Sequence, residues 1–116
     1  MSITVSLDIN AKPPVTVSLP DPYPVSAGVA ETLIWVPAAK GQAFTFKSLT
    51  FDNNPSAFGP PNVTPAQVTV QDTPAPPGGP ANTYPYTILV ESGGKTYSSD
   101  PPGLGGVQKK PGIRNG

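Results

Sequence analysis

The chain has 116 residues, enough for one domain with a single sandwich-sized core, and its 7 basic and 7 acidic residues leave no net charge. It contains no cysteine and no histidine, which excludes disulfides, thiolate or imidazole metal sites and every catalytic triad or dyad that needs an imidazole. Without a basic surplus we expect no nucleic-acid partner, and we expect no cofactor or metal, so any chemistry falls to carboxylates, lysines, hydroxyls and backbone.

The first residues, Met1-Ser-Ile-Thr-Val5, open directly into a strand pattern. No basic and apolar leader precedes them, and no apolar run is long enough to span a membrane. We therefore expect no signal peptide and no membrane partner. The compartment stays open between the cytoplasm and export by a non-classical route.

Short segments of alternating polar and apolar residues follow one another, separated by Pro, Gly and Asn. The predicted strands are residues 2–9, 15–19, 31–36, 43–51, 66–71, 84–91 and 95–100. The run Leu33-Ile-Trp-Val36 is apolar on both faces and predicts a central strand. The segment Pro20-Asp-Pro-Tyr-Pro24 excludes a helix and a central strand. Two pairs of apolar residues in 43–51 are out of phase, which predicts a bulge near Lys47-Ser48.

Seven short strands without a helical stripe predict an all-β fold, namely a seven-stranded immunoglobulin-like β-sandwich with extended loops and a Pro/Gly-rich C-terminal tail. A small open barrel is the alternative. We expect residues 1–100 to form the β-sandwich domain and residues 101–116 to form an extended C-terminal arm or tail.

The clearest hairpin is formed by Tyr84-Pro-Tyr-Thr-Ile-Leu-Val-Glu91, a Gly93-Gly94 turn and Lys95-Thr-Tyr-Ser-Ser-Asp100. A two-residue turn at these glycines places Val90 opposite Tyr97 and Thr87 opposite Asp100. Asp100, followed by Pro101, therefore lies at the end of a fixed strand. The other Asp-Pro pair, Asp21-Pro22, lies in a loop.

An Asp-Pro bond has a reactive side chain next to a tertiary amide. The carboxylate of Asp100 can attack its own carbonyl carbon through a five-membered ring and expel the nitrogen of Pro101. Water then opens the cyclic anhydride and leaves a cut chain, or a lysine amine opens it and leaves an isopeptide link. The fold must supply a proton for the departing nitrogen and donors for the developing oxyanion. An ordinary turn is the alternative reading of the same dipeptide.

The hairpin motif Tyr-Thr-Ile-Leu-Val-Glu, Gly-Gly, Lys-Thr-Tyr-Ser-Ser-Asp-Pro resembles the C-terminal hairpin of a small bacterial β-sandwich family, the DP-EP proteins. The resemblance implies self-cleavage after the aspartate, a lysine–aspartate link and self-assembly, with Asp100 as the reacting carboxyl and Pro101 as the leaving residue. The family's linking lysine lies upstream, where this chain reads Ala81-Asn82-Thr83. Lys47 and Lys95 are the substitutes we consider.

The segment after Pro101 carries apolar residues spaced by glycine and proline, namely Leu104, Val107 and Ile113, and basic residues Lys109, Lys110 and Arg114. One reading is a flexible tail. The other is an arm that lies on the sheet edge of a neighbouring subunit, so the expected partner is the protein itself, as a homo-oligomer or filament.

Two further groups of residues complete the candidates. The carboxylates Asp52, Asp72, Glu91 and Asp100 could meet at one end of the sandwich, although their spacing favours neither a catalytic dyad nor a calcium loop. Five aromatic residues are expected in the core: Trp35, Phe44, Phe46, Phe51 and Tyr86. Three near loops are candidates for a binding patch: Tyr23, Phe58 and Tyr84.

The leading hypothesis from these patterns is a structural or self-assembling β-sandwich subunit with autoproteolysis at Asp100-Pro101. Any enzymatic activity is at most that of an intramolecular self-cleaving endopeptidase. The alternative is a carbohydrate- or protein-binding module that uses loops at one end of the sandwich. An enzyme acting on a separate substrate ranks third, because the side-chain inventory is poor.

Overall fold

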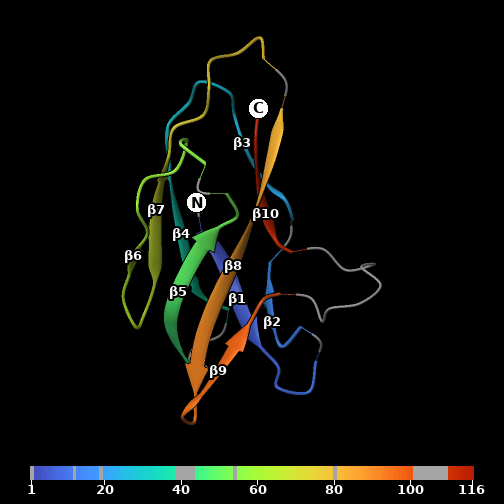
Figure 1. Ribbon diagram of the computed structural model, residues 1–116, viewed down its shortest axis with the longest axis vertical. Coiled ribbons are helices and arrows are strands. Elements are labelled where there is room, and N and C mark those ends of the chain that lie inside the picture. The colour runs from blue at the N-terminus through green and yellow to red at the C-terminus, as the bar shows by residue number, and fades with distance from the viewer. Residues whose placement is uncertain are drawn as a thin grey trace.

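The structure, a computed structural model, describes residues 2–11, 13–18, 20–38, 44–53, 55–79, 81–100 and 110–116. The described residues form two five-stranded β-sheets packed as a sandwich, and they include no helix (Figure 1). The ten strands are β1 (Ser2–Leu7), β2 (Val15–Val17), β3 (Tyr23–Val25), β4 (Glu31–Pro37), β5 (Thr45–Phe51), β6 (Asn62–Val63), β7 (Val68–Asp72), β8 (Asn82–Ser92), β9 (Lys95–Ser98) and β10 (Gly112–Asn115).

Each sheet is mixed. The first has the order β2-β1-β4-β7-β6, with β1 and β4 parallel. The second has the order β3-β10-β8-β5, with β10 parallel to β3 and antiparallel to β8. Strand β9 also pairs with β8, so the long β8 carries β9 beside its end and β10 beside its start (Figure 1).

The core lies between the two sheets and is filled by alternate residues of the strands. Trp35 of β4 and Tyr86 of β8 meet there edge to face, with ring centroids 5.4 Å apart. The indole Nε1 of Trp35 donates a hydrogen bond of 3.1 Å to the hydroxyl of Tyr86, which satisfies the buried N–H. All five aromatic residues expected in the core are buried: Trp35, Phe44, Phe46, Phe51 and Tyr86.

Several sequence predictions of local structure are confirmed. Each of the seven predicted segments contains a strand, and β4 is central in its sheet. The β5–β8 register shifts between Phe46 and Ser48, where the bulge was expected. The proline-rich segment 20–24 contributes only to β3, which lies at the edge of its sheet and so needs hydrogen bonds on one side only.

The prediction of seven strands is wrong in number, because three short strands were missed: β3, β6 and β10. β3 contains Pro24, β6 has two residues, and Gly112-Ile-Arg-Asn115 shows no alternation that marks a strand. Pairing with longer neighbours, not intrinsic preference, makes these segments extended.

The C-terminal residues differ from the expected arm. β10 lies between β3 and β8, and Ile113 is 0% exposed, so residues 112–115 complete the sandwich of their own chain. Asp21 Oδ1 accepts a hydrogen bond of 3.0 Å from the backbone N–H of Gly112, which fixes the start of β10. The other apolar residues proposed as anchors, Leu104 and Val107, lie outside the described residues, as do Pro101 and Lys109.

Since the described residues form no helix, none of them makes up a helical segment that could span a membrane.

Candidate functional site

The hairpin places Asp100 where the sequence register predicts it. Gly93 and Gly94 have φ values of 58° and 79°, the left-handed conformation that a tight hairpin turn requires. Val90 pairs with Tyr97, and beyond the end of β9 the backbone N–H of Ser99 still donates to the carbonyl of Ile88 at 3.1 Å. The hydroxyl Oγ of Ser99 accepts a hydrogen bond of 2.9 Å from the N–H of Ile88. Asp100 thus follows a strand whose last residues are tied to β8.

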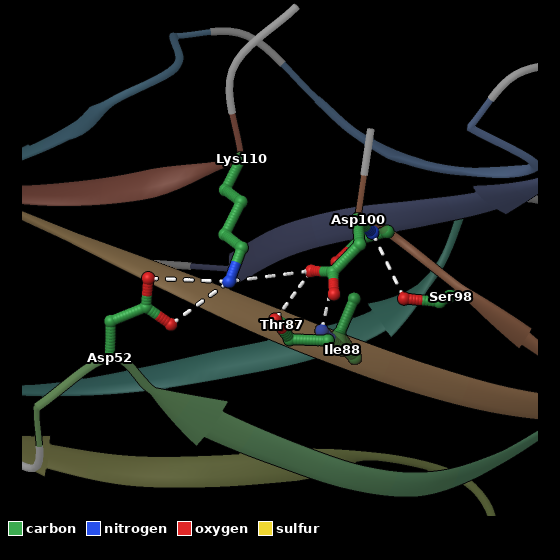
Figure 2. Close-up of polar contacts among 7 residues, drawn as sticks. Asp52, Thr87, Ile88, Ser98, Asp100 and Lys110 are labelled. Atoms are coloured by element: carbon green, nitrogen blue, oxygen red, sulfur yellow. Dashed lines mark hydrogen bonds and ion pairs between the residues drawn. The ribbon is translucent and has the colours of Figure 1, made fainter. Parts of the chain in front are cut away.

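The Asp100 carboxylate is held in place but open to solvent. The hydroxyl of Thr87 donates to Asp100 Oδ1 at 2.5 Å, and the backbone N–H of Asp100 donates to Ser98 Oγ at 3.0 Å (Figure 2). The side chain is 46% exposed. The expected proximity of Thr87 and Asp100 is therefore confirmed.

Strands β9 and β10 lie along the same edge of β8 with a gap between them in the sequence. The residue numbers of each β8–β9 pair add to 187, as for 89 and 98, and those of each β8–β10 pair add to 197, as for 85 and 112. The backbone N–H of Tyr86 donates to the carbonyl of Pro111 at 3.0 Å, which agrees with the β8–β10 register because 86 and 111 also add to 197. Asp100 and Lys110 thus correspond to the same position, opposite Thr87. The chain leaves β8 at Asp100 and returns to that point ten residues later.

Because the chain returns there, Lys110 lies beside Asp100. Its amino group is 3.1 and 3.2 Å from Asp52 Oδ1 and Oδ2 and 3.7 Å from Asp100 Oδ1, so that one ammonium lies between two carboxylates (Figure 2). Asp52 directly follows β5, and its N–H donates to the carbonyl of Pro85 in β8 at 3.0 Å. The hydrogen bond with Asp52 raises the pKa of Lys110, and the charge of Asp100 adds to this effect. Lys110 is therefore an ammonium at neutral pH.

The lysines considered from the sequence lie elsewhere. Lys47 forms an ion pair of 3.0 Å with Glu91, and Lys95 begins β9 at the hairpin turn. Lys110 was not singled out as a partner of Asp100, because sequence patterns did not reveal that β10 rejoins β8 at this point. The one signal is that residues 110–116 could be aligned with β8 in the same direction as β9.

The four candidate carboxylates do not form a common group. Asp52 and Asp100 come together around Lys110, whereas Glu91 pairs with Lys47 and Asp72 is buried against Asn115. The amino group of Lys110 lies between Asp52 and Asp100, which is not the direct carboxyl–carboxyl contact of a dyad that shares one proton.

The three aromatic residues considered for a binding patch do not form one surface patch. Tyr23 is a buried residue of β3, so its assignment to a surface patch is wrong, because pairing with β10 draws it into the core. Phe58 stacks on Phe51 with centroids 3.9 Å apart and contacts Tyr84 edge to face at 5.3 Å. Phe58 and Tyr84 are half-buried at the margin of the core.

No protein-family model matches this chain, and a search of curated proteins gives no match. The resemblance to the DP-EP proteins therefore rests on the residues of the hairpin and on the chemistry of the Asp-Pro bond.

Proposed function

We propose that the protein is an immunoglobulin-like β-sandwich that serves as a structural, self-assembling subunit and cleaves its own chain between Asp100 and Pro101. One observation carries the proposal: the carboxylate of Asp100 is held by Thr87 at the end of a fixed hairpin, with the ammonium of Lys110 3.7 Å away. A reactive carboxylate and a proton source thus lie together next to an Asp-Pro bond.

The chemistry begins with attack of an Asp100 carboxylate oxygen on the carbonyl carbon of the same residue. A C–O bond forms, the C–N bond to Pro101 breaks, and the nitrogen takes up one proton. Lys110 can supply that proton. The hydrogen bond from Thr87 favours a defined side-chain orientation and so reduces the entropy lost on ring closure.

The anhydride then has two possible fates. Water gives a free carboxyl group at residue 100 and releases the amino group of Pro101. Lys110, once it has given its proton to proline, is an amine that can open the anhydride and form an amide with Asp100. Asp52 opposes this second fate, because its contact with Lys110 favours the ammonium, which is not a nucleophile. We therefore propose that hydrolysis dominates at neutral pH.

Cleavage would leave the two pieces bound to each other. The C-terminal piece, residues 101–116, contains β10, which pairs with both β3 and β8 and buries Ile113. A sizing experiment under native conditions therefore cannot detect cleavage, and a measurement under denaturing conditions is needed.

Mass spectrometry under denaturing conditions tests the proposal. Hydrolysis predicts masses for residues 1–100 and 101–116 whose sum exceeds the chain by one water. Transfer to Lys110 predicts an unchanged total mass with a new proline amino terminus, which fragmentation identifies. Asp100→Ala removes the nucleophile and should give only the uncut linear chain.

Thr87→Val is the matched variant, because it keeps the shape of the side chain and the reacting groups but loses the hydroxyl. We expect slower cleavage rather than none. Equal cleavage in the wild type and in Asp100→Ala would show that a contaminating protease cuts the chain, and an uncut wild-type chain after long incubation would refute self-cleavage.

Self-assembly is the second part of the proposal and is tested separately. A chain with 12% charged residues and no net charge resists association poorly. β2, β6 and β3 lie at sheet edges within the described residues and offer backbone groups to another chain. Size exclusion and electron microscopy should show large species. A monomer at high concentration, unchanged by deletion of residues 101–109, would argue against assembly.

A binding module is the second candidate function, supported by one groove. About 380 Å³ of space lies beside the end of β5, lined in part by Phe51, Pro55, Phe58, Pro60 and Pro61. Flat aromatic and proline surfaces suit a sugar ring or an extended peptide. A glycan or peptide screen should yield a ligand whose binding is lost in Phe58→Ala. A screen without such a ligand removes this candidate.

A further inference from the structure

A polar pair lies inside the apolar core, away from the Asp100 site. Asp72 is the last residue of β7 and is 0% exposed, and Asn115 is the last residue of β10 and is 6% exposed. Asn115 donates a hydrogen bond of 2.8 Å from Nδ2 to Asp72 Oδ1. Since β7 and β10 belong to different sheets, this bond ties the end of the chain's last strand to the opposite sheet.

The pair leaves two buried acceptors without a donor among the described residues, namely Asp72 Oδ2 and Asn115 Oδ1. An ionised carboxylate and an amide carbonyl are both acceptors only, so neither can satisfy the other. One proton on Asp72 Oδ2 makes that oxygen a donor. A neutral carboxyl and a primary amide can then exchange two hydrogen bonds side by side, which satisfies both acceptors.

The surroundings of Asp72 oppose its negative charge. On β4, Glu31 lies directly opposite Asp72 in the register, and its Oε2 accepts a hydrogen bond of 3.2 Å from the hydroxyl of Tyr23 on β3. Burial, and then the charge and hydrogen bond of Glu31, raise the pKa of Tyr23 to about 12, so the phenol stays a donor. From β8, the register neighbour of Asn115 is the neutral Asn82. No ion pair formed among the described residues brings a cation to Asp72.

The titration of Asp72 points the same way. Burial raises the pKa of the Asp72 carboxyl and the charge of Glu31 adds to the rise, whereas the hydrogen bond from Asn115 lowers it; burial is the largest of these effects.

We propose that Asp72 and Asn115 form a buried proton-binding site, in which a neutral carboxyl and an amide hold the end of β10 against β7. The folded protein binds this proton more tightly than the unfolded chain does. The stabilisation is therefore complete below the ordinary aspartate pKa of about 3.9, and it is lost as the pH rises through the higher folded value. This inference does not depend on cleavage, but in a cut chain the same site would help to retain residues 101–116.

The direct test is a ¹³C NMR titration of the Asp72 side-chain carboxyl in the intact chain, made with Asp100→Ala to exclude cleavage. We expect its titration midpoint to lie above about 3.9. In Glu31→Gln, which removes the neighbouring charge but keeps Asp72, the midpoint should fall but stay above that value. A midpoint at or below about 3.9 in the first protein overturns the proposal.

Asp72→Asn, added to the same protein, supplies a second test. Its amide can donate to Asn115 Oδ1 and accept from Asn115 Nδ2, so it mimics the neutral carboxyl without a proton. At neutral pH its urea midpoint should equal or exceed that of the parent, and its stability should vary less with pH. Two results would overturn the proposal: a urea midpoint of Asp72→Asn below that of the parent at every pH, or a urea midpoint of the parent that rises on addition of Na⁺, K⁺ or Ca²⁺. Either result would show that Asp72 is an ionised carboxylate bound to water or to a cation. If Asp72→Asn does not fold, the NMR titration decides.

Discussion

At the scale of single residues, the ammonium of Lys110 forms ion pairs with both Asp52 and Asp100. The side chain is 31% exposed, so solvent screens the ion pairs and their contribution to stability is roughly 0.2–1 kcal/mol. We predict that Lys110→Gln lowers the free energy of unfolding by about this amount at neutral pH. Because Asp52 raises the pKa of Lys110, the contribution is complete below the ordinary lysine pKa of about 10.4 and is lost as the pH rises through the folded value.

Urea unfolding of the wild type and Lys110→Gln between pH 7 and pH 11 measures this difference. Lys95→Gln is the matched control, because Lys95 lies at the hairpin turn and forms no ion pair within the described residues. Equal effects of Lys110→Gln and Lys95→Gln at pH 7, or an effect of Lys110→Gln that does not decline with rising pH, would show that the ion pairs of Lys110 do not stabilise the fold.

A second prediction at this scale concerns the fate of the anhydride. Asp52→Asn keeps the size of the side chain but removes the charge that favours the ammonium form of Lys110. We expect a larger fraction of reacted chains to carry the Lys110–Asp100 amide, by a few-fold, relative to hydrolysed chains. Peptide mapping of both products measures the ratio. An unchanged or smaller ratio would show that Asp52 does not select between the two fates.

At the scale of elements, β10 is a core strand despite its four residues. Ile113 is 0% exposed, and truncation of a buried isoleucine to alanine costs about 2–5 kcal/mol. We therefore predict that Ile113→Ala lowers the free energy of unfolding by that amount, as measured in urea. Arg114→Ala, at the exposed neighbouring position, is the control and should change it by less than about 0.5 kcal/mol. Similar effects of both substitutions would mean that β10 is not packed in the core.

The shared register of β9 and β10 gives another prediction at this scale. Deletion of residues 101–110 joins Asp100 to Pro111, which are the positions opposite Thr87 and Tyr86 along β8. We expect the shortened chain to fold with at least the stability of the parent, because Asp100 is joined directly to Pro111. The entropy cost of bringing these two residues together across ten intervening residues, roughly 2 kcal/mol, is then removed. Thermal unfolding of both chains measures this. A large loss of stability would contradict the continuous edge along β8.

At the scale of the whole molecule, the all-β sandwich was predictable because two-residue alternation marks the longer strands, and the Gly93-Gly94 turn fixes the register as far as Asp100. The site was predictable only on its hairpin side. Lys110 and Asp52 come close to Asp100 through strand pairings between segments distant in the sequence. β10 has a single large apolar residue, Ile113, so its sequence does not show the alternation typical of a strand. The buried Asp72 was likewise indistinguishable in sequence from an exposed aspartate, because its burial depends on a strand from the other sheet.

We propose that the fold as a whole prepares the Asp100–Pro101 bond for intramolecular cleavage, and the decisive measurement is a time course of denaturing mass spectra. We expect the wild-type chain to be converted to residues 1–100 and 101–116, or to the Lys110-linked form, with a first-order rate constant that is independent of protein concentration. Asp100→Ala should stay linear and intact. A wild-type chain that remains linear and intact over the same time course, or cleavage that persists in Asp100→Ala, would contradict it.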